Sequence, residues 1–214
     1  MNLYLAVETS SHEFAVALGD TEQVFLSSSG SVPSAARADL QSLVTELLRT
    51  IDRRHRDIRA IGVDIGPGGL SSTRAGASYA NALAFSLGVK VYPFSYFDIV
   101  AAQTAGSSVP IVCVVPAAAG NAYVALLDGS SRTTGFGPFG PTVARIVGDR
   151  PEVAVAGRLR DRVAPFIGSR INDTGIDAPS PAVLLEMTVR ADHLGMGAAL
   201  QAIPLNEQAP EFRE

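Results

Sequence analysis

A glycine-rich turn is the stretch of this 214-residue chain whose residue types best suit ligand chemistry. An apolar run ends in Gly66, Pro67, Gly68 and Gly69, and Arg74 follows in the first turn of an expected helix. Glycines allow close backbone approach, and a helix N-terminus presents unpaired N–H groups with a partial positive charge. Together with the guanidinium of Arg74, the turn could hold a phosphate or a carboxylate. It matches neither the Walker A loop nor GxGxxG, so a tight strand-to-helix turn without a ligand is the equal alternative.

Two carboxylates stand near the ends of apolar, strand-like runs. Glu8 follows the run Leu3–Val7, and Asp64 lies in the run Ile61–Ile65 just before the glycines. Two carboxylates at strand ends could hold Mg²⁺ and, through it, phosphate groups. No lysine or evident general base accompanies them, so hydrogen bonding to nearby loops is the competing interpretation. We therefore assign no catalytic residue.

The histidines and the cysteine form no recognisable site in the sequence. His12, His55 and His193 are scattered and show neither His-x-x-x-His nor His-Glu-x-x-His spacing, so no metal site is predicted. Cys113 lies in the apolar run Ile-Val-Cys-Val-Val, which favours a buried structural thiol over a nucleophile. Serines are abundant, but nothing pairs one with a histidine and an acid.

The composition is that of a globular protein, with 47% apolar residues and a formal net charge of −4. A free-standing nucleic-acid binder usually carries a basic excess, so the charge argues against that class. A subunit that meets RNA through a partner remains possible. No basic region followed by a long apolar segment opens the chain, and no apolar run reaches the roughly 18–20 residues that span a bilayer. We expect a soluble cytoplasmic protein that does not contact a membrane.

Two expected helices of the first half have faces that suit a partner. In the stretch 35–53, apolar residues recur at spacings of 3, 4, 7, 8 and 11, which place them on one stripe. In the stretch 71–88, small residues dominate, and they permit close approach either of the helix's own sheet or of another chain. We expect these helices to pair with each other and to form the surface for a partner. The predicted contact residues are Leu40, Leu43, Val44, Leu47, Ala75, Gly76, Tyr79, Ala80 and Leu83.

The order of the expected elements repeats. Strands are expected at 3–7, 14–18, 23–28, 61–65 and 89–94, and helices at 35–53, 71–88 and 95–106. A reduced second half has strands at 110–115, 122–127, 131–136 and 152–156, and helices at 142–147, 159–166 and 181–194. Two βββαβαβα units predict an α/β protein with two lobes, residues 1–106 and 107–214, each a mixed sheet with helices. This order is the signature of the actin-like, sugar-kinase-like (ASKHA) ATPase fold, in which nucleotide binds between the lobes.

Three stretches resemble the bacterial TsaB (YeaZ) family. They are AVETS with the following FAVAL, DIGPGGLSSTRAG, and VKVYPFSYFDIVAAQ. The family pattern around the second stretch is close to GPGSFTGLRIG, and here Gly66, Pro67, Gly68, Arg74 and Gly76 match it. The tail AIPLNEQAPEF is similar, more loosely, to the family's closing proline-containing segment. The resemblance covers the first half of the chain well and the second half faintly.

The resemblance implies a part in making threonylcarbamoyladenosine on transfer RNA. TsaB proteins have the two-lobed fold and are not thought to perform the chemistry themselves. They pair with TsaD, a related catalytic subunit that binds metal through two histidines, and TsaE, a small ATPase, completes the complex. The chain would then be a scaffold that docks on a TsaD-like subunit, or forms a homodimer through the same helices, and meets tRNA indirectly. It would need no cofactor of its own, with ATP or ADP only at the partner interface.

Two departures mark the chain as a divergent member or a paralogue with a changed role. The family usually has aspartate where Glu8 stands, and it often has an Asp-Ala-Arg-Arg-Gly-Glu-like run near residues 116–121, where this chain carries no charge. The alternative function is a stand-alone ATPase or phosphotransferase of the actin-like fold. The alanine-rich helix and the missing carboxylate–lysine–histidine equipment favour the scaffold.

Overall fold

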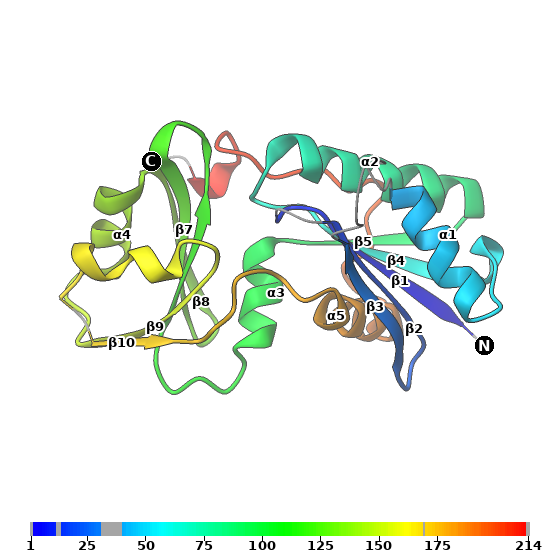
Figure 1. Cartoon of the computed structure of the whole chain (residues 1–214), viewed down its shortest axis with the longest axis horizontal. Helices are drawn as coiled ribbons and strands as arrows, with labels where there is room; N and C mark the ends of the chain where they lie inside the picture. Colours follow the sequence, from blue (N-terminus) through cyan, green and yellow to red (C-terminus); the bar gives the residue numbers. More distant parts are fainter. Residues whose placement is uncertain (1, 12–13, 31–39, 169, 213–214) are drawn as a thin grey trace. The chain divides into compact units, whose positions relative to one another are not determined.

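The chain folds into two compact units of α/β structure. The computed structural model describes residues 2–11, 14–30, 40–168 and 170–212 (Figure 1). One unit comprises Met1–Tyr96 and Ser180–Pro204, and the other comprises Phe97–Pro179 and Leu205–Glu214. Each unit is therefore assembled from two separate stretches of the chain.

The first unit is built on a five-stranded mixed sheet in the order β3-β2-β1-β4-β5. β2 pairs antiparallel with β1 and β3, whereas β4 pairs parallel with β1 and β5. Because β1 and β4 run parallel, the residues at their carboxyl ends, Glu8 and Asp64, meet at one edge of the sheet. The strands are β1 (Leu3–Glu8), β2 (Phe14–Gly19), β3 (Val24–Gly30), β4 (Ile58–Asp64) and β5 (Lys90–Phe94).

Helices cover both faces of this sheet (Figure 1). α1 (Leu40–Thr50) and α2 (Leu70–Leu87) pack on one face and share an apolar core with alternate strand residues. The predicted pairing of these two helices is confirmed, because they contact each other on the same side of the sheet. α5 (Pro181–Leu194) packs on the opposite face. There a Cβ at Gly62 would lie only 1.8 Å from Oγ1 of Thr188, so the glycine allows the close approach of α5.

A buried carboxylate anchors α5 to the sheet. Asp192 accepts hydrogen bonds from the hydroxyls of Tyr4 at 3.0 Å and Tyr92 at 2.8 Å. It also accepts one from Nε of Arg59 at 2.7 Å. Burial by itself raises the pKa of Asp192, but the hydrogen bonds outweigh that effect and lower the pKa to about 2. Since the three donors lie on β1, β4 and β5, the last helix is fixed to three strands of the first unit.

The second unit repeats the strand arrangement of the first. Its strand order is β10-β9-β6-β7-β8, with β6 in the centre. On one side β7 pairs antiparallel with β6 and with β8, and on the other side β9 pairs parallel with β6 and with β10. The identical topology confirms the predicted duplication and the two-lobed α/β fold class. The strands are β6 (Ile111–Pro116), β7 (Asn121–Asp128), β8 (Ser131–Pro138), β9 (Glu152–Ala156) and β10 (Arg170–Asp173).

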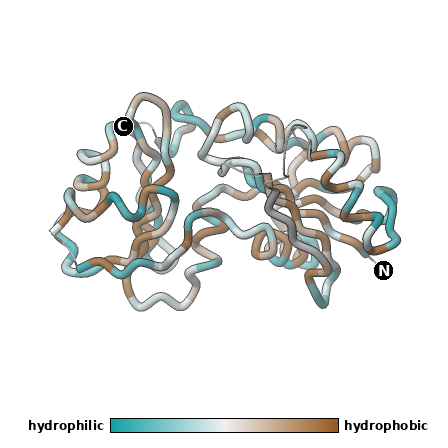
Figure 2. Tube along the Cα trace, viewed as in Figure 1, coloured by the Kyte–Doolittle hydropathy of each residue, from teal (hydrophilic) through white to brown (hydrophobic). Residues whose placement is uncertain are grey.

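The helices of the second unit are α3 (Tyr96–Gln103) and α4 (Phe139–Val147). α4 packs on β7 and β8 and closes an apolar core with the buried strand residues. In both units the hydrophobic residues follow the strands and the connecting loops are more polar (Figure 2). Within the residues that the structure describes, no helix is long and apolar enough to cross a membrane.

The predicted helix over 159–166 is wrong. Two short 3₁₀ helices, Arg160–Arg162 and Ala164–Phe166, stand in its place. Pro165 has no backbone N–H and falls inside the predicted span, so a continuous α-helix would lose a hydrogen bond there. The following strand β10 is not among the sequence expectations, because its residues Arg-Ile-Asn-Asp are mostly polar. It lies at the edge of the sheet, where exposed side chains are tolerated.

The compact units do not follow the predicted boundary at residue 106. The last helix of each half joins the other unit: all but the first residue of α3 belongs to the second unit, and α5 belongs to the first. The sequence shows that each helix has apolar residues to bury, but it does not show which sheet will cover them. Residues 35–39, the start of the first predicted helix, lie outside the described residues.

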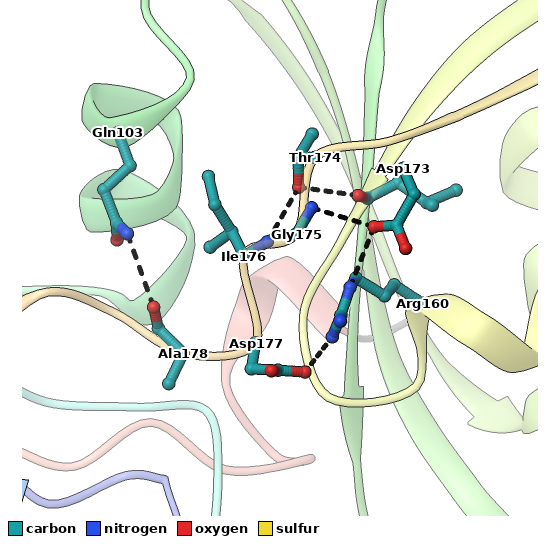
Figure 3. A network of polar contacts seen from close by, with 9 residues as sticks. Gln103, Arg160, Asp173, Thr174, Gly175, Ile176, Asp177 and Ala178 are labelled. Carbon is teal, nitrogen blue, oxygen red and sulfur yellow. Dashed lines mark hydrogen bonds and ion pairs between the residues drawn. The ribbon is translucent and has the colours of Figure 1, made fainter.

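A polar network holds the loop after β10 in the second unit (Figure 3). Nε of Arg160 donates to Asp173 at 2.8 Å, and Nη1 of the same arginine pairs with Asp177. Nε2 of Gln103 on α3 donates to the carbonyl of Ala178 at 3.4 Å. One arginine thus pairs with two aspartates, so the loop is closed by ion pairs and does not present an open acidic site.

Candidate functional site

The candidate site lies at the carboxyl ends of β1 and β4 in the first unit. Glu8 and Asp64 are exposed over only 1% and 0% of their surfaces. The hydroxyl oxygen of Ser10 lies 3.0 Å from Oε1 of Glu8 and 2.5 Å from Oδ2 of Asp64, so it bridges the two side chains. A hydroxyl has a single hydrogen and can donate to only one of them. A proton on one of the two carboxyls would make the other contact a hydrogen bond as well.

The pKa values of this acid pair, Glu8 and Asp64, are both raised, which favours a protonated carboxyl. Burial raises the pKa of Asp64 well above its usual value, and the neighbouring charge of Glu8 raises it further. Burial also raises the pKa of Glu8, although hydrogen bonds from Ser11 and Ser10 act against that shift. Two carboxylates in one buried site repel each other, and holding one proton between them removes most of this cost. The acid pair therefore keeps a proton at a pH where a solvated carboxyl has lost it.

The remaining oxygens of the acid pair are also hydrogen-bonded. Ser11 donates its backbone N–H to Oε1 of Glu8 at 2.9 Å and its hydroxyl to Oε2. The N–H of Gly66 donates to Oδ1 of Asp64 at 2.7 Å. Each of the four carboxyl oxygens therefore has a donor within the chain. This is the loop-bonding interpretation of Glu8 and Asp64, the alternative to a magnesium site.

The glycine turn is shaped by its contact with the loop between β1 and β2. Gly66 has a φ of +89°, and the Gly66–Pro67 peptide is cis. A Cβ at Gly68 would lie 2.2 Å from the carbonyl oxygen of Ser10. The N–H of Gly69 donates to that same carbonyl at 3.1 Å. The glycines let the turn reach the backbone of Ser10, and this contact accounts for Gly68 without a bound anion.

Arg74 is the fifth residue of α2, and its side chain has no partner in the described part of the chain. Arg74 is exposed, and its side chain forms no hydrogen bond or ion pair among the described residues. Gly69 caps the helix without a side-chain hydrogen bond. The residual negative charge of the acid pair nearby opposes an anion at this turn. The anion site at the glycine turn stays a prediction.

The acid pair fits a metal-bound nucleotide poorly. Mg²⁺ takes oxygen ligands that are open to it, whereas Glu8 and Asp64 are buried and their oxygens already accept hydrogen bonds. In the described ranges, no group of three or more His, Cys, Asp or Glu side chains could hold a metal ion. His12 lies outside those ranges, and His55 and His193 belong to separate elements, η1 (His55–Asp57) and α5.

Several predicted contact residues belong to the core of their own unit. They lie on the inward faces of α1 and α2, so burial against the sheet determines their types. Gly76 is small because of Thr9: a Cβ at Gly76 would lie 2.1 Å from Oγ1 of Thr9. The buried residues are Leu40, Val44, Leu47, Gly76 and Ala80.

The other predicted contact residues remain partly accessible. Leu43, Tyr79 and Leu83 are half-buried, and Ala75 is exposed. A groove of about 370 Å³ opens between α1 and α2, and its lining contains no Asp, Glu, Lys or Arg. We call this the helix-pair groove. Its lining residues are Gln41, His55, Tyr79, Ala82, Leu83, Ser86 and Leu87.

Sequence reasoning did not select Ser10 and Ser11, which complete the acid pair. A signal was present, since Glu8 opens the polar cluster Glu-Thr-Ser-Ser directly after a buried strand. Short hydroxyl side chains in such a position can hydrogen-bond a carboxylate one to three residues away. Cys113 is buried as expected, and burial raises the pKa of its thiol far above the usual value, which agrees with a structural role.

Two mixed sheets of identical topology, each with flanking helices, define a duplicated α/β fold of the actin-like kind. The family model described as TsaD, tRNA N6-adenosine threonylcarbamoyltransferase, matches residues 21–152. The chain therefore belongs to this family. The tRNA N6-adenosine threonylcarbamoyltransferase of Chromobacterium violaceum is 32% identical over an alignment 112 residues long, which covers 45% of this chain and 33% of that protein. The match thus spans about a third of the length of that relative.

Solved structures resemble the chain over nearly its whole length. YeaZ from Pseudomonas aeruginosa superposes with a TM-score of 0.74 at 21% identity, covering 96% of this chain and 100% of YeaZ. A protein with similarity to peptidase YeaZ, from the same organism, gives 0.75 at 20% identity, covering 96% and 99%. The activator of 2-hydroxyisocaproyl-CoA dehydratase from Clostridium difficile, with bound ADPNP, gives 0.57 at 10% identity, covering 90% and 96%. The predicted YeaZ-like fold is confirmed.

Proposed function

We propose that this chain is a non-catalytic partner subunit in the formation of threonylcarbamoyladenosine on tRNA, docking on a TsaD-like catalytic subunit. The observation that carries the proposal is the closed state of the acid pair. The carboxyls of Glu8 and Asp64 form hydrogen bonds to loops of this chain. The chain therefore keeps the fold of a transferase family without presenting an open metal site, and a shared fold does not by itself imply a shared activity. The family match and the YeaZ-like fold support the link to tRNA modification.

The helix-pair groove supports the docking part of the proposal. Its apolar wall is formed by half-buried Tyr79, Leu83 and Leu87 on α2, and Leu43 of α1 packs against the same core. An apolar groove between two helices suits the apolar face of a partner helix. We therefore assign the partner surface to Leu43, Ala75, Tyr79 and Leu83. A TsaE-like ATPase and tRNA would join through the catalytic subunit, with ATP or ADP at the interface with that subunit.

Affinity capture from native lysate tests the docking. The tagged wild-type chain should recover a TsaD-like protein, and Leu83→Glu should lose it, because a charge in the groove would be desolvated on docking. Ala144→Glu is the matched control, since Ala144 is exposed on α4 of the second unit. A thermal melt must show that Leu83→Glu stays folded. Equal recovery with both variants would refute the assignment of the groove.

Two further measurements separate this proposal from the stand-alone ATPase. Deleting the gene should lower the threonylcarbamoyladenosine content of tRNA, and Ala144→Glu should restore it while Leu83→Glu should not. The purified chain should not turn over ATP without its partner. Robust hydrolysis by the chain alone would favour the ATPase or phosphotransferase and would count against the scaffold.

A further inference from the structure

The segment that joins α1 to β4 in the first unit is rich in arginine (Figure 1). The stretch 49–59 has five arginines and two aspartates, which gives it a formal charge of +3. Since the whole chain has a net charge of −4, the rest of the chain carries −7. We call this segment the arginine turn. Its arginines are Arg49, Arg53, Arg54, Arg56 and Arg59.

Backbone hydrogen bonds keep the arginine turn compact. The N–H of Arg53 donates to the carbonyl of Leu48 at 2.8 Å and closes the end of α1. The N–H of Arg54 donates to the carboxylate of Asp57 at 2.9 Å, and the N–H of Asp57 donates back to the carbonyl of Arg54 at 2.9 Å. The carboxylate of Asp57 is therefore engaged by the backbone, and the arginine side chains start from one ordered turn.

Three of the arginines are open to an external partner. All five are exposed, and Arg59 pairs with the buried Asp192 at 2.7 Å. The side chains of Arg49, Arg54 and Arg56, in contrast, form no hydrogen bond or ion pair with any residue that the structure describes. A guanidinium group that is not paired within its own chain is available to a carboxylate or a phosphate, which it can bind through two parallel hydrogen bonds.

The arginine turn borders the helix-pair groove. His55 lies between Arg54 and Arg56 in the sequence, and it lines that groove. A subunit docked in the groove would therefore lie beside the open arginines. The reaction for which the family is named takes place on tRNA, and tRNA is a polyanion.

We propose that the arginine turn binds the phosphate backbone of tRNA while the TsaD-like subunit holds that tRNA, an inference that rests on the proposed docking. An acidic surface of the partner protein is the weaker candidate. Protein interfaces have an apolar centre, whereas none of the large apolar side chains exposed in the described part of the chain belongs to the arginine turn. Because the chain as a whole is acidic, these arginines would add to the contacts of the catalytic subunit and would not bind tRNA alone.

Salt-dependent binding of tRNA to the assembled complex tests the proposal. The complex of the tagged chain and the TsaD-like protein is titrated with a labelled, unmodified tRNA transcript at several salt concentrations. With the duplex value of about 0.9 counterion released per phosphate contact, one arginine contributes about fivefold in affinity at about 0.15 M salt. Arg54→Ala/Arg56→Ala should therefore bind tRNA about 30-fold more weakly than the wild type. The slope of log K against log salt concentration should become less steep by about 2.

Arg158→Ala/Arg170→Ala is the matched control, because both arginines are exposed on the second unit and the change in charge is the same. This control complex should bind tRNA like the wild type. Both double variants should keep the melting temperature of the wild type, since the side chains that they remove are exposed. Arg54→Lys/Arg56→Lys retains the charge and should retain most of the salt dependence.

The proposal is overturned if the complex forms and the two alanine double variants bind tRNA with the same affinity and the same salt slope. It is also overturned if Arg54→Ala/Arg56→Ala no longer recovers the TsaD-like protein, since the arginines would then contact protein and not RNA. Failure of the proposed function shows separately, before tRNA is added, as a wild-type chain that recovers no TsaD-like protein. That result would overturn both proposals.

Discussion

Replacing Asp64 with asparagine should flatten the dependence of stability on pH. The asparagine amide matches the hydrogen bonds of a protonated Asp64: its oxygen can accept from the N–H of Gly66, and its nitrogen can donate to Ser10 or Glu8. The change removes the shared proton but preserves the geometry. If the acid pair holds one proton in the folded state, the variant should be the more stable protein at neutral pH.

The magnitude follows from proton linkage. The unfolded chain releases the proton of Asp64 near the usual pKa of 3.8, whereas the buried acid pair keeps it to a higher pH. Between those values the folded state binds one proton more than the unfolded state, so stability is lost as the pH rises. Within that interval the free energy of unfolding should fall by about 1.4 kcal/mol per pH unit. Such a slope is measurable against the roughly 5–15 kcal/mol by which domains are stable.

Urea unfolding followed by circular dichroism measures this effect, since the chain has no tryptophan to report by fluorescence. The wild type and Asp64→Asn should be compared at several values between about pH 5 and pH 8. Their difference should grow in favour of the variant as the pH rises. Asp64→Ala is the control: it leaves the N–H of Gly66 without its acceptor and removes one of the two carboxyls that Ser10 bridges, so it should be destabilised at every pH. Parallel curves for the wild type and Asp64→Asn would refute the shared proton.

Three other changes test contacts that the structure makes specific. Gly68→Ala should cost about 1–3 kcal/mol in urea unfolding, because its Cβ would press on the backbone of Ser10, whereas the control Gly69→Ala meets only a side-chain hydroxyl and should cost less. Asp192→Asn should lower the free energy of unfolding by about 2–4 kcal/mol at neutral pH. The wild type should lose this stabilisation as the pH falls from about 4 toward the Asp192 pKa of about 2, whereas the variant has no such dependence. Equal stability of the two proteins at neutral pH would show that the anchor of α5 is dispensable. Ala119→Gly should raise the melting temperature, stabilising by about 1 kcal/mol, since Ala119 has a φ of +57°; an unchanged or lower melting temperature would refute this strain.

The strands and most helices could be predicted because the spacing of apolar residues within each segment indicates which side chains are buried. Val7 and Val63 belong to short apolar runs that are covered on both faces, and such runs predict central strands whatever surrounds them. The stripe that includes Leu40 and Val44 predicts an amphipathic helix. The repeated order of these elements was enough to predict the duplicated fold, because connections between strands and helices follow few topologies.

Long-range contacts could not be predicted in the same way. Small residues such as Gly76 and Ala80 suit close packing, but only the structure shows that the neighbour is the helix's own sheet. The role of Ser10 depends on a carboxylate 54 positions away in the sequence. The attachment of α5 to the first unit depends on Asp192 meeting two tyrosines from distant strands. Such pairings leave no periodic signal in a single sequence.

The two halves of the duplication differ at the strand ends where the first half has its carboxyls. β1 ends at Glu8, whereas the corresponding β6 ends at Pro116 and continues into an alanine-rich 3₁₀ turn. β4 ends at Asp64, whereas β9 ends at Ala156, after which Gly157 packs on the backbone of Val114. Acidic side chains thus persist at these strand ends only in the first unit, and there they bond to the chain's own loops. The sheets are therefore kept in both units, whereas the strand-end carboxyls are kept only in the first.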